Sequence, residues 1–177
     1  MPQMNKGGKF IFGISLIHSD GAVLLPAQAV EEYAIAKEGR VILLSGSKST
    51  GGFCVTRKGL LEKSRLSHIL SENPALSSYE INEGEFIKYK GRFYCWKRID
   101  TSGRLQLDDE ILGFLNLKPG MRLLSIRSSD IAFTMGAKGP LIEKSQRYSG
   151  FIPLYDLDQQ DPGLYPKFFH DLMDRNR

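Results

Sequence analysis

Six basic residues and one carboxylate between residues 85 and 104 have the types and spacing that bind phosphate groups. They are Lys88, Lys90, Arg92, Lys97, Arg98, Arg104 and Asp100. Arginine presents a planar fork of N–H donors that matches phosphate oxygens and guanine edges. Asp100 precedes Arg104 by four residues, across a turn, where its carboxylate can pair with that guanidinium. We therefore expect this stretch to contact duplex DNA; the alternative is a solvated strand face whose surface ion pairs stabilise little.

The positive charge of the chain is concentrated in this stretch. The formal net charge of all 177 residues is +4. The segment 85–104 alone carries +4, from six basic residues against Glu85 and Asp100, so the rest of the chain sums to zero. A local excess of positive charge favours a polyanionic partner.

Aromatic residues alternate with these cations. They are Phe86, Tyr89, Phe93, Tyr94 and Trp96. Such alternation is compatible with base stacking on single-stranded nucleic acid. It is also what an ordinary amphipathic β-hairpin shows, because aromatic residues favour strands. The second interpretation is preferred here, and Trp96 is expected in a core or an interface.

The elements that position the cations are short and closely spaced. Phe93, Cys95 and Ile99 share one strand face by parity, and Ser102-Gly103 supplies a turn. The residues from Arg104 to Leu107 alternate polar and apolar, as in a half-buried strand. Three acids at 108–110 predict the first turn of a helix, which 118–120 should stop. A β-hairpin over 121–135 is expected to follow.

The same pattern occurs earlier in the chain, at an offset near 80 residues. Five separate stretches of the N-terminal half match stretches of the C-terminal half, which indicates a tandem duplication. We expect a first unit with a trailing helix (8–70, the helix over 60–70), a polar linker (71–84), a second unit (85–150) and a tail (151–177). The tail should end in a short amphipathic helix over 168–173.

The order β-turn-β-α-β-β resembles the AbrB/SpoVT family of swapped-hairpin DNA-binding domains. The likeness is carried by the segment from Lys97 to Arg104 and by Leu117-Lys118-Pro119-Gly120. Two tandem units, each followed by a helix, resemble the MraZ branch of that superfamily. The resemblance implies a mainly β fold with short helices, in which two ββαββ units form a swapped-hairpin barrel. It also implies a DNA-binding transcription regulator.

The second unit is expected to make the main DNA contact. The first unit lacks the matching cations, because Ala22 stands opposite Arg104 in the repeat and Ser15-Leu16 stand near Lys97-Arg98. One chain then carries one unit that can bind DNA. Binding to a two-fold symmetric DNA site would need two chains, so we expect a homodimer or larger homo-oligomer.

An alternative function is a degenerate copy of this fold that serves as a protein-interaction or assembly module. Loss of charge in the first unit, and Leu112-Gly113 where many family members carry arginines, favour it. The tail offers apolar and aromatic residues from Phe151 to Phe169 for a second copy or another protein. An antitoxin-like protein would combine both activities, binding DNA and a partner.

The sequence contains little evidence of an enzyme active site, and we expect no catalytic residue, cofactor or metal. His18, His68 and His170 lie far apart, and His18 is expected on the surface. The glycine-rich loop 46–52 lacks the Lys-Ser/Thr of a phosphate-binding loop, so a flexible hairpin loop is preferred. Cys54 and Cys95 are interpreted as buried free thiols, which fits a reducing cytoplasm. No apolar run is long enough to cross a membrane, and no signal-peptide core is expected.

Overall fold

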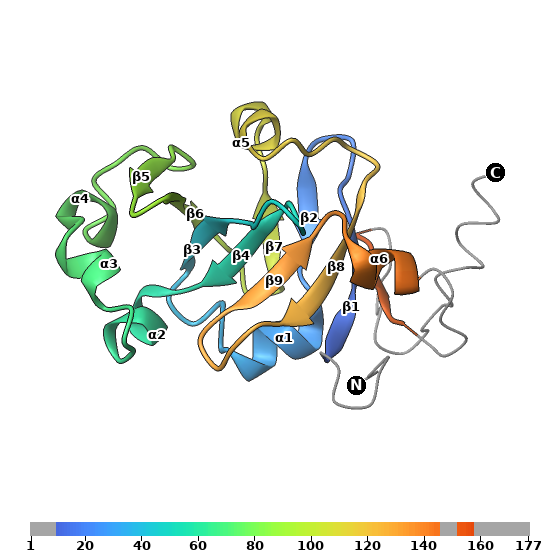
Figure 1. The fold of residues 1–177 in the computed structure, drawn as a ribbon, viewed down its shortest axis with the longest axis horizontal. Helices are drawn as coiled ribbons and strands as arrows, with labels where there is room; N and C mark the ends of the chain where they lie inside the picture. The colour runs from blue at the N-terminus through green and yellow to red at the C-terminus, as the bar shows by residue number, and fades with distance from the viewer. Residues whose placement is uncertain (1–9, 146–151, 158–177) are drawn as a thin grey trace.

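A computed structural model describes residues 10–145 and 152–157, which form a mixed fold of mainly strands with short helices (Figure 1). This confirms the predicted fold class at that level. The strands are β1 (Ile11–Leu16), β2 (Ala22–Leu24), β3 (Arg40–Ser45), β4 (Phe53–Thr56), β5 (Ile87–Tyr89), β6 (Arg92–Arg98), β7 (Arg104–Gln106), β8 (Arg122–Arg127), β9 (Phe133–Gly136) and β10 (Leu154–Tyr155). The helices are α1 (Ala27–Glu32), α2 (Lys58–Glu62), α3 (His68–Ser71), α4 (Pro74–Ser77), α5 (Asp109–Phe114) and α6 (Pro140–Ser145).

Eight strands form one large sheet in the order β10-β1-β8-β9-β4-β3-β6-β5, and β2 pairs with β7 in a separate two-stranded ribbon. The large sheet has two edges, β10 and β5, which do not pair with each other. It is therefore not closed into the barrel that the resemblance implied. The ribbon lies across the inner side of the curved sheet, and the buried side chains of both fill the space between them.

Strands of the N-terminal half pair with strands of the C-terminal half in matching registers. Ile14 of β1 faces Leu124 of β8, and Trp96 of β6 faces Ile42 of β3. Ile14 and Trp96 stand 82 positions apart, and so do Ile42 and Leu124. The two ladders are thus equivalent under one offset. At the centre of the sheet, β4 pairs with β9, so the halves also meet there.

The ribbon β2–β7 joins the halves a second time. Its central pair is Val23 with Leu105, again 82 positions apart, and both side chains are fully buried. Leu25 N donates to Gly103 O at one end, and Leu107 N donates to Gly21 O at the other, both at 2.9 Å. Gly103 has φ +89°, and a Cβ there would lie 2.7 Å from Val30 Cγ2. A glycine is therefore required at this turn.

α5 ends at Phe114, earlier than the stop expected at 118–120, and α1 likewise is short and ends at Glu32. Ala34 and Asn116 take positive φ values of 47° and 57°. A left-handed residue stops helical hydrogen bonding, which the sequence pattern did not reveal. The predicted start of α5 is confirmed, because Asp108 Oδ1 accepts from Ile111 N at 2.9 Å.

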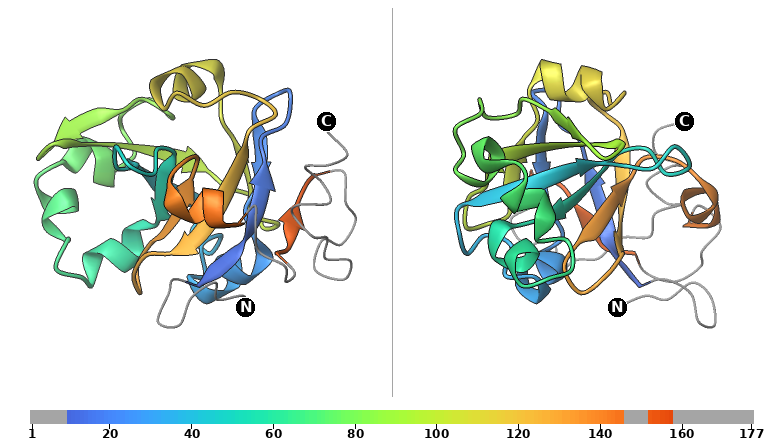
Figure 2. Two further views of the ribbon diagram at one scale, coloured as in Figure 1. Left: turned by 45° about the vertical axis from the view of Figure 1, so that its right-hand side comes forward. Right: turned by 60° about the vertical axis from the view of Figure 1, so that its left-hand side comes forward.

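The largest core lies between the inner face of the sheet, the ribbon and the helices α1 and α5. Phe12, Phe53 and Phe133 fill it from three strands of the large sheet. In Figures 1 and 2, α1 and α5 lie on opposite sides of the molecule, so each helix closes one end of this core. Burial of these apolar surfaces is the main source of stability.

Two smaller cores cover the outer face of the sheet at its two flanks. One packs α2, α3 and α4 on β3 and β6, with Trp96 and Leu76 buried. The other packs Ile152 and Leu154 of the tail on β1 and β8, with α6 against it. Figures 1 and 2 show these two covers on opposite flanks, with β4 and β9 between them.

Two expectations about the connecting segments change. The helix expected over 60–70 is interrupted, giving α2 and α3. The segment 71–84 is more than a polar linker, because it contains α4 and buries Leu76 completely. In the tail, β10 pairs with β1 in parallel, while the helix expected over 168–173 lies outside the described residues. In the described part of the chain, no helix has the length and apolar character to cross a membrane.

Leu105→Ala should destabilise the whole fold, because this fully buried side chain fills the core between the two halves. We expect the free energy of unfolding to fall by about 2–5 kcal/mol in urea titrations. Leu66→Ala is the matched control, since Leu66 is 40% exposed, and it should cost less than about 1 kcal/mol. Equal losses for both variants would show that the ribbon does not hold the halves together.

Candidate nucleic-acid interface

Exposed and buried residues alternate from the end of β6 to Asp100 and again along β7, and this alternation sorts the predicted site residues. Arg98, Asp100 and Arg104 are exposed, whereas Lys97 and Ile99 are buried. Asp100 N donates to Arg104 O at 3.4 Å, so the chain folds back on itself there. The structure thus brings the two arginines to the solvent side of one strand-turn-strand.

Asp100 holds the turn rather than the guanidinium of Arg104. Its Oδ1 accepts from Ser102 N at 3.0 Å, from Ser102 Oγ at 2.6 Å and from Arg104 N at 2.9 Å. Partial burial acts to raise the pKa of this carboxyl, but the hydrogen bonds from Ser102 and Arg104 outweigh it and hold the pKa below its usual value. The carboxylate therefore fixes the backbone from which Arg104 projects.

The side chain of Arg104 meets a carboxylate from the other half of the chain. Its Nη2 lies 3.9 Å from Asp20 Oδ2, with the two side chains 46% and 61% exposed. An ion pair this long and this exposed is weak. Arg104 is therefore able to exchange Asp20 for a phosphate group at little cost.

Arg98 stands directly opposite Arg40 of β3 in the antiparallel register. Like charges in facing positions destabilise a strand pair. The guanidinium of Arg40 lies 4.5 Å from the ring centre of Tyr79 and 5.5 Å from that of Trp96, which offsets part of the repulsion. Arg40 was not among the residues predicted from the sequence, although the repeat places another arginine, Arg122, at the equivalent position of the second half. Arg98, Arg104 and Arg40 are thus the exposed cations placed at this end of β6 and in the turn that follows.

Lys97 is not part of this face. Its side chain is 8% exposed, and its Nζ lies 3.6 Å from Glu83 Oε2. The partner comes from the segment expected to be a linker, which is why the sequence did not reveal the pairing. An ammonium held beneath the surface cannot reach a phosphate, so we leave Lys97 out of the candidate interface.

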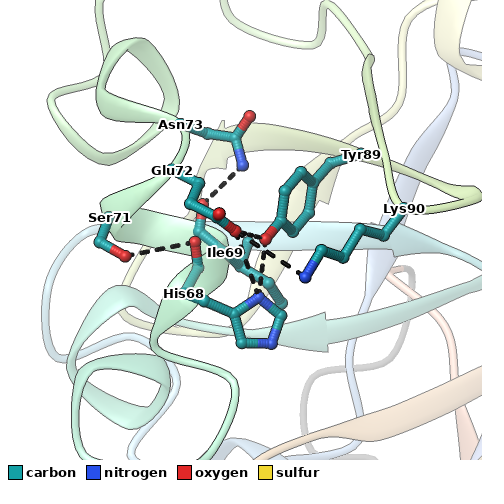
Figure 3. Close-up of polar contacts among 7 residues, drawn as sticks. All are labelled: His68, Ile69, Ser71, Glu72, Asn73, Tyr89 and Lys90. Atoms are coloured by element: carbon teal, nitrogen blue, oxygen red, sulfur yellow. Dashed lines mark hydrogen bonds and ion pairs between the residues drawn. The ribbon is translucent and has the colours of Figure 1, made fainter.

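Lys88, Lys90 and Arg92 belong to the β5–β6 hairpin at the opposite end of β6. Seven residues of β6 span about 20 Å, since a strand rises about 3.3 Å per residue. Lys90 Nζ lies 4.0 Å from Glu72 Oε2, in a polar cluster with Tyr89 and His68 (Figure 3). The single basic stretch of the sequence therefore becomes two groups on the folded chain.

Arg92 turns across the outer face of the sheet. Its Nη2 donates to Ser45 O at 2.7 Å and lies 3.8 Å from Cys54 Sγ. These contacts carry the guanidinium away from the end of β6 that holds Arg98. Among the three hairpin cations, Lys88 is the one whose side chain has neither an ion pair nor a hydrogen bond to the described residues.

The aromatic residues of the hairpin serve mainly in packing. Tyr94 and Trp96 are buried, and Trp96 Nε1 donates to Ile81 O at 2.8 Å. The expectation of a core position for Trp96 is confirmed. Phe86 and Phe93 remain partly exposed and contact Phe114 of α5, at ring-centre distances of 4.3 and 5.0 Å.

His18 lies at the turn of the first half, beside the tail. Its Nε2 bonds Asp156 Oδ1, and both side chains are 20% exposed. It is therefore a partly buried contact rather than the surface residue we expected. Among the described residues, no group of three or more His, Cys, Asp or Glu is arranged to hold a metal ion.

The thiols differ in their surroundings. Cys95 is buried and free, and desolvation raises its pKa to about 12. Cys54 is also free but only half-buried, on the outer face of the sheet. The expectation of two buried thiols thus holds for Cys95 alone.

Comparison with known proteins found no family model that matches the chain and no curated protein that matches it.

Asp100→Ala should lower the free energy of unfolding by about 1 kcal/mol at neutral pH, because three donors lose their acceptor. Asp100→Asn keeps one oxygen and should retain part of this stability. The pKa of Asp100 is lower in the folded protein than in the unfolded chain. The stability that its negative charge contributes is therefore fully present above about pH 4, the pKa of an unfolded aspartate. That stability is lost as the pH falls through the lower pKa of the folded protein. Urea titrations of the three proteins at neutral and acidic pH would test this. A gap between wild type and Asp100→Asn that does not shrink toward acid would contradict the assignment.

Proposed function

We propose that the protein is a DNA-binding transcription regulator of the AbrB/SpoVT type, which binds duplex DNA through the strand-turn-strand of its second half. The observation that carries this proposal is the exposed placement of Arg98 and Arg104 on either side of a turn held by Asp100. A rigid turn limits the entropy lost when the two guanidinium groups bind phosphate oxygens.

The ribbon β2–β7 supports contact with a duplex. A two-stranded ribbon is narrow enough to enter the major groove or to follow its edge. Arg104 and Gln106 of β7 are exposed on it, and Gln106 Nε2 also donates to Asp20 O of the first half. The ribbon thus presents donors suited to phosphate and base edges.

The matching cross-half registers support the wider resemblance. In a swapped-hairpin fold, two equivalent units contribute strands to a common body, and here β1–β8 and β6–β3 are equivalent ladders. We propose that the two halves are tandem units of this kind, with their sheet open rather than closed. Because the matching position of the first half is Ala22, one chain carries one competent half and a homodimer would supply the second.

Removing both arginines should weaken binding to DNA and make it less sensitive to salt. We expect Arg98→Ala/Arg104→Ala to reduce the slope of log affinity against log salt concentration by about 2, one unit for each lost phosphate contact. Fluorescence anisotropy with labelled random-sequence duplexes, over a series of salt concentrations, measures this slope.

Lys88→Ala is the matched control, because it removes an exposed cation at the distant end of β6. For this variant, the slope of log affinity against log salt concentration should equal that of the wild type within about half a unit. A wild-type affinity that does not respond to salt, or a double variant that binds like the wild type, would refute the proposed interface.

An assembly module is the second candidate function, and the aromatic group around Phe114 favours it. Phe114 is 48% exposed, and its ring stacks on Phe86 with an interplanar angle of 8°. Exposed aromatic side chains of this kind are enriched where proteins contact one another. The partner that we propose is a second copy of this chain, as the dimer expectation requires.

Phe114→Gln should weaken self-association about tenfold without unfolding the protein, because the side chain is half exposed. Sedimentation equilibrium of the variant and the wild type would measure it. Leu66→Gln is the control, since Leu66 is the other exposed large apolar residue in the described part of the chain. If both variants and the wild type are monomers at all concentrations, this candidate fails.

A further inference from the structure

The middle of the outer face of the sheet holds a cavity of about 330 Å3. It lies over the β4–β9 pair, between the cover formed by α2, α3 and α4 and the cover formed by α6 and the tail. The β3–β4 loop forms one wall, with Ser47 and Thr50, and the β8–β9 hairpin forms another, with Ser128. The cavity is thus built by both halves of the chain.

The polar side chains of this lining are all able to donate a hydrogen bond. Its polar side chains are those of Ser47, Thr50, Ser128, Thr134, Cys54, Arg92 and Arg127. Arg127 donates to Glu32 of α1, which neutralises its charge. Within the described part of the chain, no aspartate or glutamate lines the cavity. A guanidinium and several hydroxyls that can donate, without a carboxylate, are what an anionic ligand requires.

Arg92 is held in place to act as the charged donor. Both of its hydrogen bonds within the described residues come from Nη2, to Ser45 O and Cys54 Sγ. A guanidinium has five N–H donors, so the N–H donors of Nη1 can bind an oxyanion while Nη2 keeps the side chain anchored. The Arg92 side chain is therefore already ordered before the ligand binds, and binding loses little of its conformational entropy.

The hydroxyl groups are able to turn toward a ligand. Ser128 Oγ bonds Thr134 Oγ1, and Ser47 Oγ lies 2.9 Å from Thr50 Oγ1. Each hydroxyl rotates about its C–O bond, so these mutual bonds can be replaced by bonds to an acceptor. Ile126 and Leu141 add an apolar wall beside them.

We propose that this cavity binds a small molecule that carries a phosphate group. The phosphate oxygens accept from Arg92 and from the hydroxyls of Thr134 and Ser128, and a small apolar group of the ligand packs on Ile126 and Leu141. The loop 46–52 participates through its side-chain hydroxyls. It differs from a phosphate-binding loop before a helix, because a strand follows it. This site is separate from the proposed DNA interface and does not depend on it.

Titration calorimetry of the full chain with phenyl phosphate, inorganic phosphate and acetate tests the proposal. We expect saturable binding of phenyl phosphate, weaker binding of inorganic phosphate because it lacks the apolar group, and none of acetate. Arg92→Gln should weaken phenyl phosphate about tenfold, through loss of a charge-assisted donor. Lys88→Gln, which removes a neighbouring exposed cation outside the cavity, should bind like the wild type.

Thr134→Val is a second variant that keeps the shape of the side chain while it removes the hydroxyl, and it should also weaken binding. A further readout is alkylation of Cys54 by iodoacetamide, which phenyl phosphate should slow in the wild type and in Lys88→Gln but not in Arg92→Gln. Absence of saturable binding by either phosphate, or equal binding by wild type, Arg92→Gln and Thr134→Val, would overturn the proposal. Arg98→Ala/Arg104→Ala should still bind phenyl phosphate, which separates this test from that of DNA binding.

Discussion

The pairing of strands from opposite halves of the chain is the constraint on which the rest of this structure depends. β1 pairs with β8, β6 pairs with β3, and the ribbon β2–β7 contains one strand from each half. The largest core therefore draws its side chains from both halves, and neither half alone can bury its apolar faces. Units of this size have too little interior for independent stability, and interleaving solves the problem by sharing one core. The helices, turns and surface groups are then placed relative to this shared body.

Strand alternation within that body decides what the basic stretch can do. Arg98 and Arg104 are exposed and Lys97 is buried, because successive side chains of a strand point alternately to its two faces. Glu83 then neutralises the buried lysine, and Asp20 lies beside Arg104. The resulting cationic face is small for one chain. This is why the proposed DNA contact and the proposed assembly of chains belong together, since two copies would double the number of arginines on one duplex.

The seam between the halves also creates the second candidate site. Cys54 and Thr134 face each other across the β4–β9 pair, one from each half, and their side chains form the floor of the cavity. Both flanks of the outer face are covered by apolar packing, so the uncovered middle is where polar side chains can remain. Arg92 reaches this place from β6 by crossing β3. A ligand bound there would contact both halves and would stabilise their junction.

The sequence alone determined the local features: the mainly β class, the turn at 100–104, the start of α5 at Asp108 and the spacing near 80 residues. These features depend on residues close together in the chain and on the alternation of polar and apolar residues, both of which can be read from the sequence. Only the tertiary structure decided that Lys97 is buried against Glu83, that Arg92 leaves the basic face for Cys54, and that Arg40 joins Arg98. It also decided that the sheet stays open and that 71–84 packs as part of the body. Each of these outcomes depends on which distant segments come into contact, and the free energy of such contacts is not contained in any short stretch of the chain.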